Sequence, residues 1–137
     1  FKAAKAGYER CVGDVAPEVG LNGSEWSFVD LLNHSMDRDY QDMARRFTEE
    51  SSPQFVGRYD PAKELRDAVE GVLASIDDAL NVATSLTSEQ LDRVGQRRGQ
   101  PFAALDALEL SVAHFEEHLA QLRDEVRPRE SLPPVSA

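Results

Sequence analysis

The sequence predicts an all-α fold, an up-down four-helix bundle with a short extra helix before the last long helix. Apolar residues recur at alternating spacings of three and four along three long segments, which is the period of a helix that buries one face. Capping residues, glycines and prolines separate these segments, and no segment has a convincing strand pattern. The chain has 137 residues, of which 41% are hydrophobic, enough for one domain with a buried core.

The first half of the chain is expected to hold two helices. The first covers residues 1–16, and because the chain begins at Phe1 rather than at a Met, we expect preceding residues to belong to it as well. A second helix is expected from about residue 25 to 50, where Ser27 and Asp30 have the spacing of a capping box. Its apolar stripe consists of Val29, Leu32, Met36, Met43 and Phe47.

A third helix and a short fourth one are expected next. Asp60 followed by Pro61 combines an N-cap acceptor with the residue favoured at the first helical position. The helix that starts there is expected to end near Ser85. Thr87 and Gln90 then have the spacing of a second capping box, which predicts a short helix. The apolar stripe of the third helix is Leu65, Val69, Val72, Ile76 and Leu80.

The last long helix is expected to begin at Pro101, after a polar loop, and to end at Pro128. Arg97 and Arg98 lie in that loop and are expected to be solvated. We therefore expect a helical domain over 1–127 and a disordered Pro- and Ser-rich tail over 128–137. The apolar stripe of the last helix is Leu105, Leu108, Val112, Phe115, Leu119, Leu122 and Val126.

Charge and cysteine content exclude several functions. The formal net charge is −10 at pH 7, which argues against binding to nucleic acid or to an anionic membrane, because both need clustered Lys and Arg. No apolar run approaches a membrane span, and no signal-peptide pattern is present. Cys11 is the only cysteine, so an intrachain disulfide and a thiolate zinc site are ruled out. A reducing, cytoplasmic location is expected on this basis.

The three histidines are the strongest candidates for chemistry. His114 and His118 form an H-x-x-x-H pair on one face of the last helix, and neutral imidazoles in that spacing suit Zn²⁺, Ni²⁺, Cu²⁺ or Fe²⁺. An ordinary surface pair is the alternative. His34 points roughly 160° away from the apolar stripe of the second helix, so periodicity alone places it in solvent.

The residues beside the histidine pair leave two interpretations open. Ala104, Ala107 and Ser111 precede His114 on the same line of the helix. Small side chains there favour either a cavity between helices or close helix packing.

Other metal motifs do not fit. Glu117 completes the H-x-x-E-H order of an inverted zinc protease, but the chain after His118 has no further ligand. The E-x-x-H pairs of di-iron bundles are absent, since Ser111 and Phe115 stand three residues before the histidines.

Two segments resemble the DinB-like (DinB/YfiT) family. The stretch WSFVDLLNHSMDRDY, residues 26–40, resembles its second-helix signature of Trp-Ser, an acidic residue, apolar residues, His and Asp. Residues 86–122 resemble its second half, in which the last helix carries H-x-x-x-H followed by Leu-x-Gln. The likeness extends over roughly residues 1–127, with Ser35 as a departure, since an apolar residue is more usual there.

The resemblance implies a four-helix bundle in which His34, His114 and His118 jointly bind one divalent ion, Zn²⁺ or Ni²⁺. Three imidazoles leave one coordination position open, as in catalytic zinc sites, where water or a thiol is activated. The family includes S-transferases and isomerases that use low-molecular-weight thiols. We therefore expect a metal-dependent S-transferase or hydrolase acting on a small molecule, without an organic cofactor and with no catalytic side chain assigned.

Supporting roles and alternatives remain open. Asp30, Asp37 and Gln121 are candidates to hydrogen-bond the metal-binding imidazoles, and Arg38 to bind a substrate carboxylate. A non-catalytic metal- or ligand-binding stress-response module is one alternative. A helical dimerisation protein with incidental histidines is another, and a homodimer fits every one of these functions.

Overall fold

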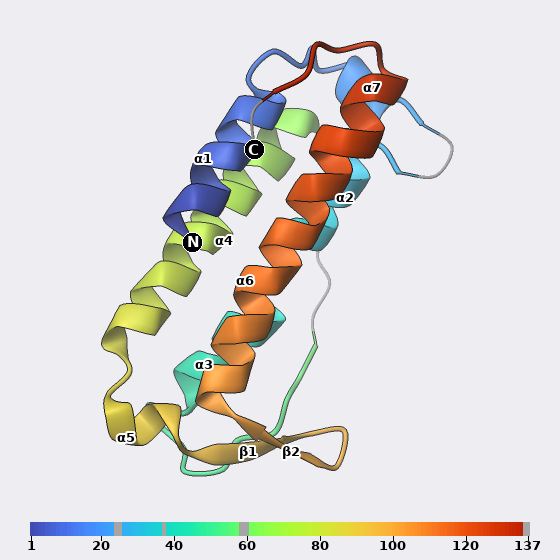
Figure 1. Cartoon of the computed structure of the whole chain (residues 1–137). Coiled ribbons are helices and arrows are strands. Elements are labelled where there is room, and N and C mark those ends of the chain that lie inside the picture. The colour runs from blue at the N-terminus through green and yellow to red at the C-terminus, as the bar shows by residue number, and fades with distance from the viewer. Residues whose placement is uncertain (24–25, 37, 58–60, 136–137) are drawn as a thin grey trace.

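The computed structural model describes residues 1–23, 26–36, 38–57 and 61–135. The chain is mostly helical with one small antiparallel sheet (Figure 1). The helices of the first half are α1 (Lys2–Val12), a 3-10 turn (Val19–Leu21), α2 (Phe28–Ser35) and α3 (Asp39–Arg46). The second half contains α4 (Leu65–Ser85), α5 (Ser88–Leu91), β1 (Val94–Arg97), β2 (Gln100–Ala103), α6 (Ala104–Gln121), a π-helical turn (Leu122–Val126) and α7 (Arg127–Arg129).

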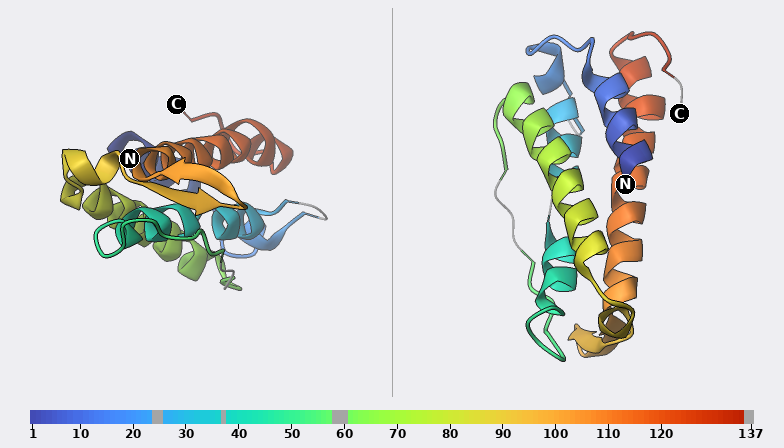
Figure 2. Two further views of the ribbon diagram at one scale, coloured as in Figure 1. Left: turned by 90° about the horizontal axis from the view of Figure 1, so that it is seen from below. Right: turned by 90° about the vertical axis from the view of Figure 1, so that its left-hand side faces the viewer.

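The long helices lie side by side along one axis, with the β1–β2 hairpin across one end and α7 at the other (Figures 1 and 2). α1 and α6 run toward the α7 end, whereas α2, α3 and α4 run toward the hairpin. Helix direction therefore does not alternate strictly along the chain, as an up-down order requires. α6 contacts α1, α2, α3 and α4, so it forms the centre of the packing.

The second predicted helix is two helices. The expected capping box is present, since the Ser27 Oγ accepts from the Asp30 backbone N–H at 3.0 Å, but α2 ends at Ser35 and α3 begins at Asp39. The side chain of Ser35 donates to the Leu31 carbonyl, a bond that competes with helix continuation. The apolar stripe did not reveal the break, because both helices bury the same side of the rod.

The hairpin replaces a predicted loop, and it corrects the expectation that the chain has no strand. β1 and β2 pair with Val94 opposite Ala103, and Arg98 and Gly99 form the tight turn with φ of 51° and 79°. Two four-residue strands rich in Arg and Gln carry no period-2 apolar signal. Because Pro101 belongs to β2, the last long helix begins at Ala104, three residues later than predicted.

The predicted bounds of α4 and α5 agree only in part with the observed ones. α5 has the predicted Thr87–Gln90 capping box, and α4 ends at Ser85 as expected. α4 nevertheless begins at Leu65, and Asp60, the predicted cap, lies outside the described residues. No helix in the part of the chain that the structure describes is long and apolar enough to cross a bilayer.

A buried polar layer divides the core into two hydrophobic clusters. The Gln41 Nε2 donates to the Ser75 Oγ at 2.7 Å, and the Ser111 Oγ donates to the Gln41 Oε1 at 3.5 Å, which joins α3, α4 and α6. The cluster on the α7 side contains Phe28, Leu31, Leu32, Val72, Ile76, Phe115, Leu119 and Leu122. The cluster on the hairpin side contains Met43, Ala44, Phe47, Val82, Phe102, Ala104, Ala107 and Leu108.

The small residues of the last helix serve close packing in the hairpin-side cluster. Ala104 and Ala107 are fully buried against residues such as Met43 and Phe47. Leu105, expected in the apolar stripe, is 44% exposed. The buried face of α6 is therefore rotated toward the line that carries the histidines, which brings this line to the helix interface.

The C-terminal segment is fastened by a buried arginine. The Arg127 guanidinium is paired with the Asp14 carboxylate and donates to the Cys11 and Pro133 carbonyls. Leu132 packs against the α7-side cluster. The first part of the predicted tail is therefore attached to α1, and disorder over 128–137 stays a prediction for the residues beyond these contacts.

Gly95 allows segment 53–55 to lie beside β1, and its replacement tests the hairpin. The Gln96 N–H donates to the Pro53 carbonyl at 2.9 Å, and a Cβ on Gly95 would overlap that carbonyl oxygen. Gly95→Ala should lower the free energy of unfolding by about 2–3 kcal/mol, measured by urea denaturation. Gly99→Asn is the control, because its surroundings are open and Asn tolerates positive φ. An unchanged midpoint for Gly95→Ala would contradict this packing.

Candidate functional site

The fold brings the three histidines together from α2 and α6. The ring centres of His114 and His118 are 4.6 Å apart, and the His34 ring centre lies 5.9 Å from that of His118. All three side chains are half-buried. The expectation from periodicity that His34 lies in solvent is wrong, because its side of α2 faces α6. Periodicity identifies only the most apolar side of a helix, whereas α2 packs against both α4 and α6.

Gln121 orients the histidine pair. The His118 Nδ1 donates to the Gln121 Oε1 at 2.6 Å, which leaves the lone pair of His118 on Nε2. The His114 Nε2 lies 3.1 Å from this atom and donates its hydrogen there. Two imidazole nitrogens that share one tetrahedral zinc lie about 3.3 Å apart. The pair therefore already has the spacing of two ligands, and binding would need the His114 proton to move to Nδ1.

Burial favours the neutral form of His114 and His34. The pKa of His114 is lowered from 6.5 to about 4, first by burial and then by the nearby His118 and His34, while Glu117 and Asp39 oppose the shift. The pKa of His34 is also lowered, first by burial and then by His118, with Asp30 acting in the opposite direction. Neutral imidazoles are the form that binds metals, so the lowered pKa values of His34 and His114 favour cation binding at pH 7.

The Tyr8 hydroxyl lies behind the site and joins three helices. It is fully buried, donates to the Phe115 carbonyl at 2.6 Å, and contacts the Ser35 Oγ at 2.9 Å. Ser35 follows His34 and Phe115 follows His114, so this junction fixes the two helices beside their histidines. It also explains Ser35, which departs from the resemblance: its hydroxyl partners the buried phenol.

Two aromatic rings border the histidines. The Trp26 ring centre lies 4.8 Å from that of His34, and Trp26 is 40% exposed. The Tyr40 ring centre lies 6.0 Å from that of His114. Trp26 was part of the resemblance, but Tyr8 and Tyr40 were missed, because single aromatics at helical spacing are typical of core residues.

The predicted supporting residues divide into three groups. Gln121 contacts His118 as expected. Asp30 caps α2 through the Ser27 N–H and acts on His34 only through its charge. Arg38 is exposed at the start of α3, and Asp37 lies outside the described residues. Arg97, expected to be a solvated loop charge, is instead half-buried among aromatic rings next to Tyr40.

Two of the three histidines are already placed to bind one metal ion together. His114 and His118 have suitable nitrogens at ligand spacing. Within the described ranges, however, no group of three or more His, Cys, Asp and Glu side chains is close enough to hold an ion as it stands. The third donor therefore requires the His34 ring to approach the pair, and side-chain rotations of that kind cost about 0.5–1.5 kcal/mol.

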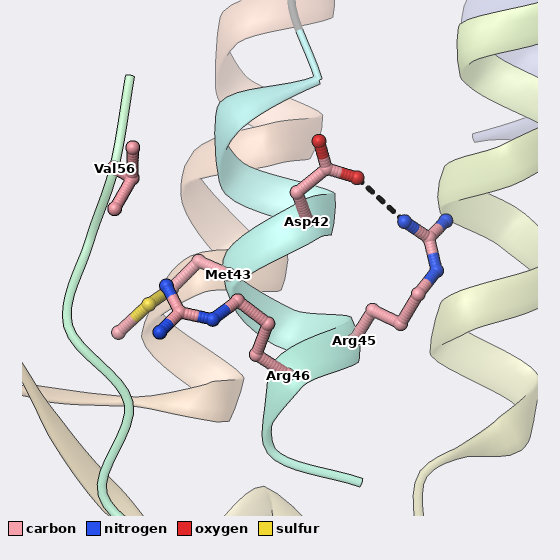
Figure 3. A pocket seen from close by; sticks show the side chains of 5 residues that line it. All are labelled: Asp42, Met43, Arg45, Arg46 and Val56. Atoms are coloured by element: carbon pink, nitrogen blue, oxygen red, sulfur yellow. Dashed lines mark hydrogen bonds and ion pairs between the residues drawn. The ribbon is translucent and has the colours of Figure 1, made fainter. Parts of the chain in front are cut away.

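A separate pocket of about 420 Å³ lies between α3 and the segment that contains Val56, and among its described lining residues Asp42 is the single carboxylate and none is a histidine (Figure 3). Arg45 is paired with Asp42 and with Asp78 of α4, and Figure 3 shows the pair with Asp42 on the side of α3 that faces away from Val56. Arg46 is paired with Glu50. The charges that line this pocket are already neutralised, so it is a weaker ligand site than the histidines.

The chain matches no family model, no curated protein and no solved structure. The interpretation of the site therefore depends on its own geometry.

A double-mutant cycle tests the Tyr8 junction. Tyr8→Phe leaves the Phe115 carbonyl without its buried donor and removes the contact of the phenol with the Ser35 Oγ, so it should cost about 1–2 kcal/mol of unfolding free energy, with a similar cost for Ser35→Ala. The double variant should cost less than the sum, because both polar groups are then removed together. Urea denaturation measures all four proteins, and strict additivity would show that the two hydroxyls do not interact.

The lowered histidine pKa values predict acid sensitivity of the metal-free protein. Between pH 6.5 and about 4, His114 is protonated in the unfolded chain but stays neutral in the folded protein. The free energy of unfolding therefore falls as the pH falls through this window. The loss should be on the order of 2 kcal/mol for His114. His114→Leu should flatten the profile measured by urea denaturation with chelator present, and an equally steep profile would contradict the assignment. Asp14 contributes at lower pH, because Arg127 lowers its pKa from 3.8.

Proposed function

We propose that the chain binds one divalent metal ion, Zn²⁺ or Ni²⁺, through His34, His114 and His118, and that it is a metal-dependent enzyme acting on a small molecule. The observation that carries the proposal is the meeting of all three histidines of the chain at one interface of α2 and α6. Incidental histidines would have no reason to gather there, half-buried between two helices. The Gln121 contact supports the same function, because metal-binding imidazoles usually donate their second N–H to such an acceptor.

The proposed fold is the four-helix bundle of DinB-like proteins. In this assignment α2 and α3 together form one rod, and α1, α4 and α6 form the other three. The order of Trp26, His34, the short helix and the H-x-x-x-H pair supports it, as does the crossing of α6 with every other rod.

Each residue of the site has a defined part in this function. His114 and His118 offer a preset pair of nitrogens, and His34 closes the site from α2. Trp26 packs against the His34 ring and Tyr40 against the His114 ring, so both aromatic rings border the space where a ligand would lie. A divalent ion held there would supply a Lewis acid that activates water or a thiol near neutral pH. An S-transferase or a hydrolase is the reaction class that we propose, with a homodimer as the expected assembly.

Metal titration of protein without an affinity tag tests the site. Competition against a chromophoric chelator should give one Zn²⁺ per chain with sub-micromolar affinity, and His114→Ala should weaken binding at least a hundredfold. His34→Ala should weaken it at least tenfold, because two ligands then remain. Glu116→Gln is the matched control, since Glu116 is exposed on the same helix and should leave the affinity unchanged.

The outcomes separate the alternatives. Absence of Zn²⁺, Ni²⁺ and Co²⁺ binding below millimolar concentration would refute the metal site. Wild-type affinity in His34→Ala would restrict the site to the α6 pair. Stoichiometric metal without turnover of a panel of thiols and electrophiles would favour the non-catalytic module.

A further inference from the structure

Arg97 is enclosed by aromatic rings at the end of β1. Its Cζ lies 5.3 Å from the ring centre of Tyr40, 5.1 Å from that of Phe55 and 5.7 Å from that of Phe102. These rings come from α3, from the segment after it and from β2, so the hairpin and the helices form the enclosure together. Cation–π attraction holds the guanidinium in place but leaves its net charge uncompensated.

The guanidinium has unused hydrogen-bonding capacity. Its Nη2 donates to the Tyr40 hydroxyl at 3.1 Å, and its Nε is buried without a partner. No carboxylate among the described residues lies within ion-pair distance of Arg97, whereas Arg127 has one and Arg45 has two. The Nη1 makes no hydrogen bond in the described part of the chain and is not among its buried unpartnered atoms, so solvent reaches it.

A half-buried cation without a counter-charge is costly unless an anion arrives from outside. The Nη1 of this planar guanidinium, which solvent reaches, can donate to a carboxylate that arrives from outside. Tyr40 connects this cation to the candidate site. The Arg97 guanidinium lies over the Tyr40 ring, and the centre of the same ring lies 6.0 Å from that of the His114 ring.

We infer that Arg97 binds the carboxylate of the small-molecule ligand and holds it so that the rest of the ligand reaches the histidines. The first part depends only on Arg97 and its enclosure. The second part rests on the proposed metal function. Arg97 is thereby a positioning residue that selects acidic ligands for a protein whose overall charge of −10 repels them.

Binding of paired thiols to Co²⁺-loaded protein tests the whole proposal. Each ω-mercaptocarboxylate from mercaptoacetate to 6-mercaptohexanoate is compared with its neutral amide, and the thiolate-to-Co²⁺ absorption band reports binding. At one chain length at least, the acid should bind roughly tenfold or more tighter than its amide. Arg97→Gln should abolish this preference without changing Co²⁺ affinity. Arg98→Gln, which removes an exposed charge from the adjacent turn position, should keep it.

A metal-free experiment separates this inference from the proposed function. The buried Nε–H of Arg97 should give a slowly exchanging NMR signal that shifts on titration with propionate and not with propionamide. If Co²⁺ fails to bind but this signal shifts, the metal site is wrong and the carboxylate site stands. An unshifted signal, equal binding of acids and amides, or an equal loss in Arg98→Gln would overturn the inference. The wild-type titration is decisive even if Arg97→Gln does not fold.

Discussion

The junction at the Tyr8 hydroxyl is the constraint on which the arrangement of the site depends. A phenol buried between helices must satisfy its polar group, and here it does so on Ser35 of α2 and on the Phe115 carbonyl of α6. Both partners are chain neighbours of site histidines. The relative position of α2 and α6 is therefore fixed within hydrogen-bond tolerance next to the site histidines. Large movement of one helix along the other would leave buried polar atoms unpaired.

The Tyr40 ring links the site histidines to Arg97, since its centre lies 6.0 Å from that of the His114 ring and 5.3 Å from the Arg97 Cζ. Burial suppresses protonation of His114 and His34, while Arg97 keeps its charge inside the aromatic rings. Low exposure thus has opposite consequences for imidazole and guanidinium, because only the imidazole can lose its proton near neutral pH. The result is a set of free lone pairs for a cation beside one fixed positive charge for an anion.

The sequence allowed good prediction of those features that depend on local chemistry. The capping boxes at Ser27 and Thr87 and the end of α4 follow from hydrogen bonding within a few residues, and the structure has them. The hairpin, the break after Ser35 and the later start of α6 were missed, because each depends on distant partners. Gly95, for example, lies in the stretch expected to be a polar loop, but its role is to admit the Pro53 carbonyl, 42 residues away.

The sequence by itself determined the helical class, the apolar stripes and the pairing of His114 with His118, since residues four apart on a helix share a face whatever surrounds them. The contact between His34 and that pair was decided only by the tertiary structure. Periodicity reports which side of a helix is most apolar, and it does not reveal whether the opposite side meets a second helix. The same reason applies to Arg97, whose surroundings come from three segments that only folding brings together.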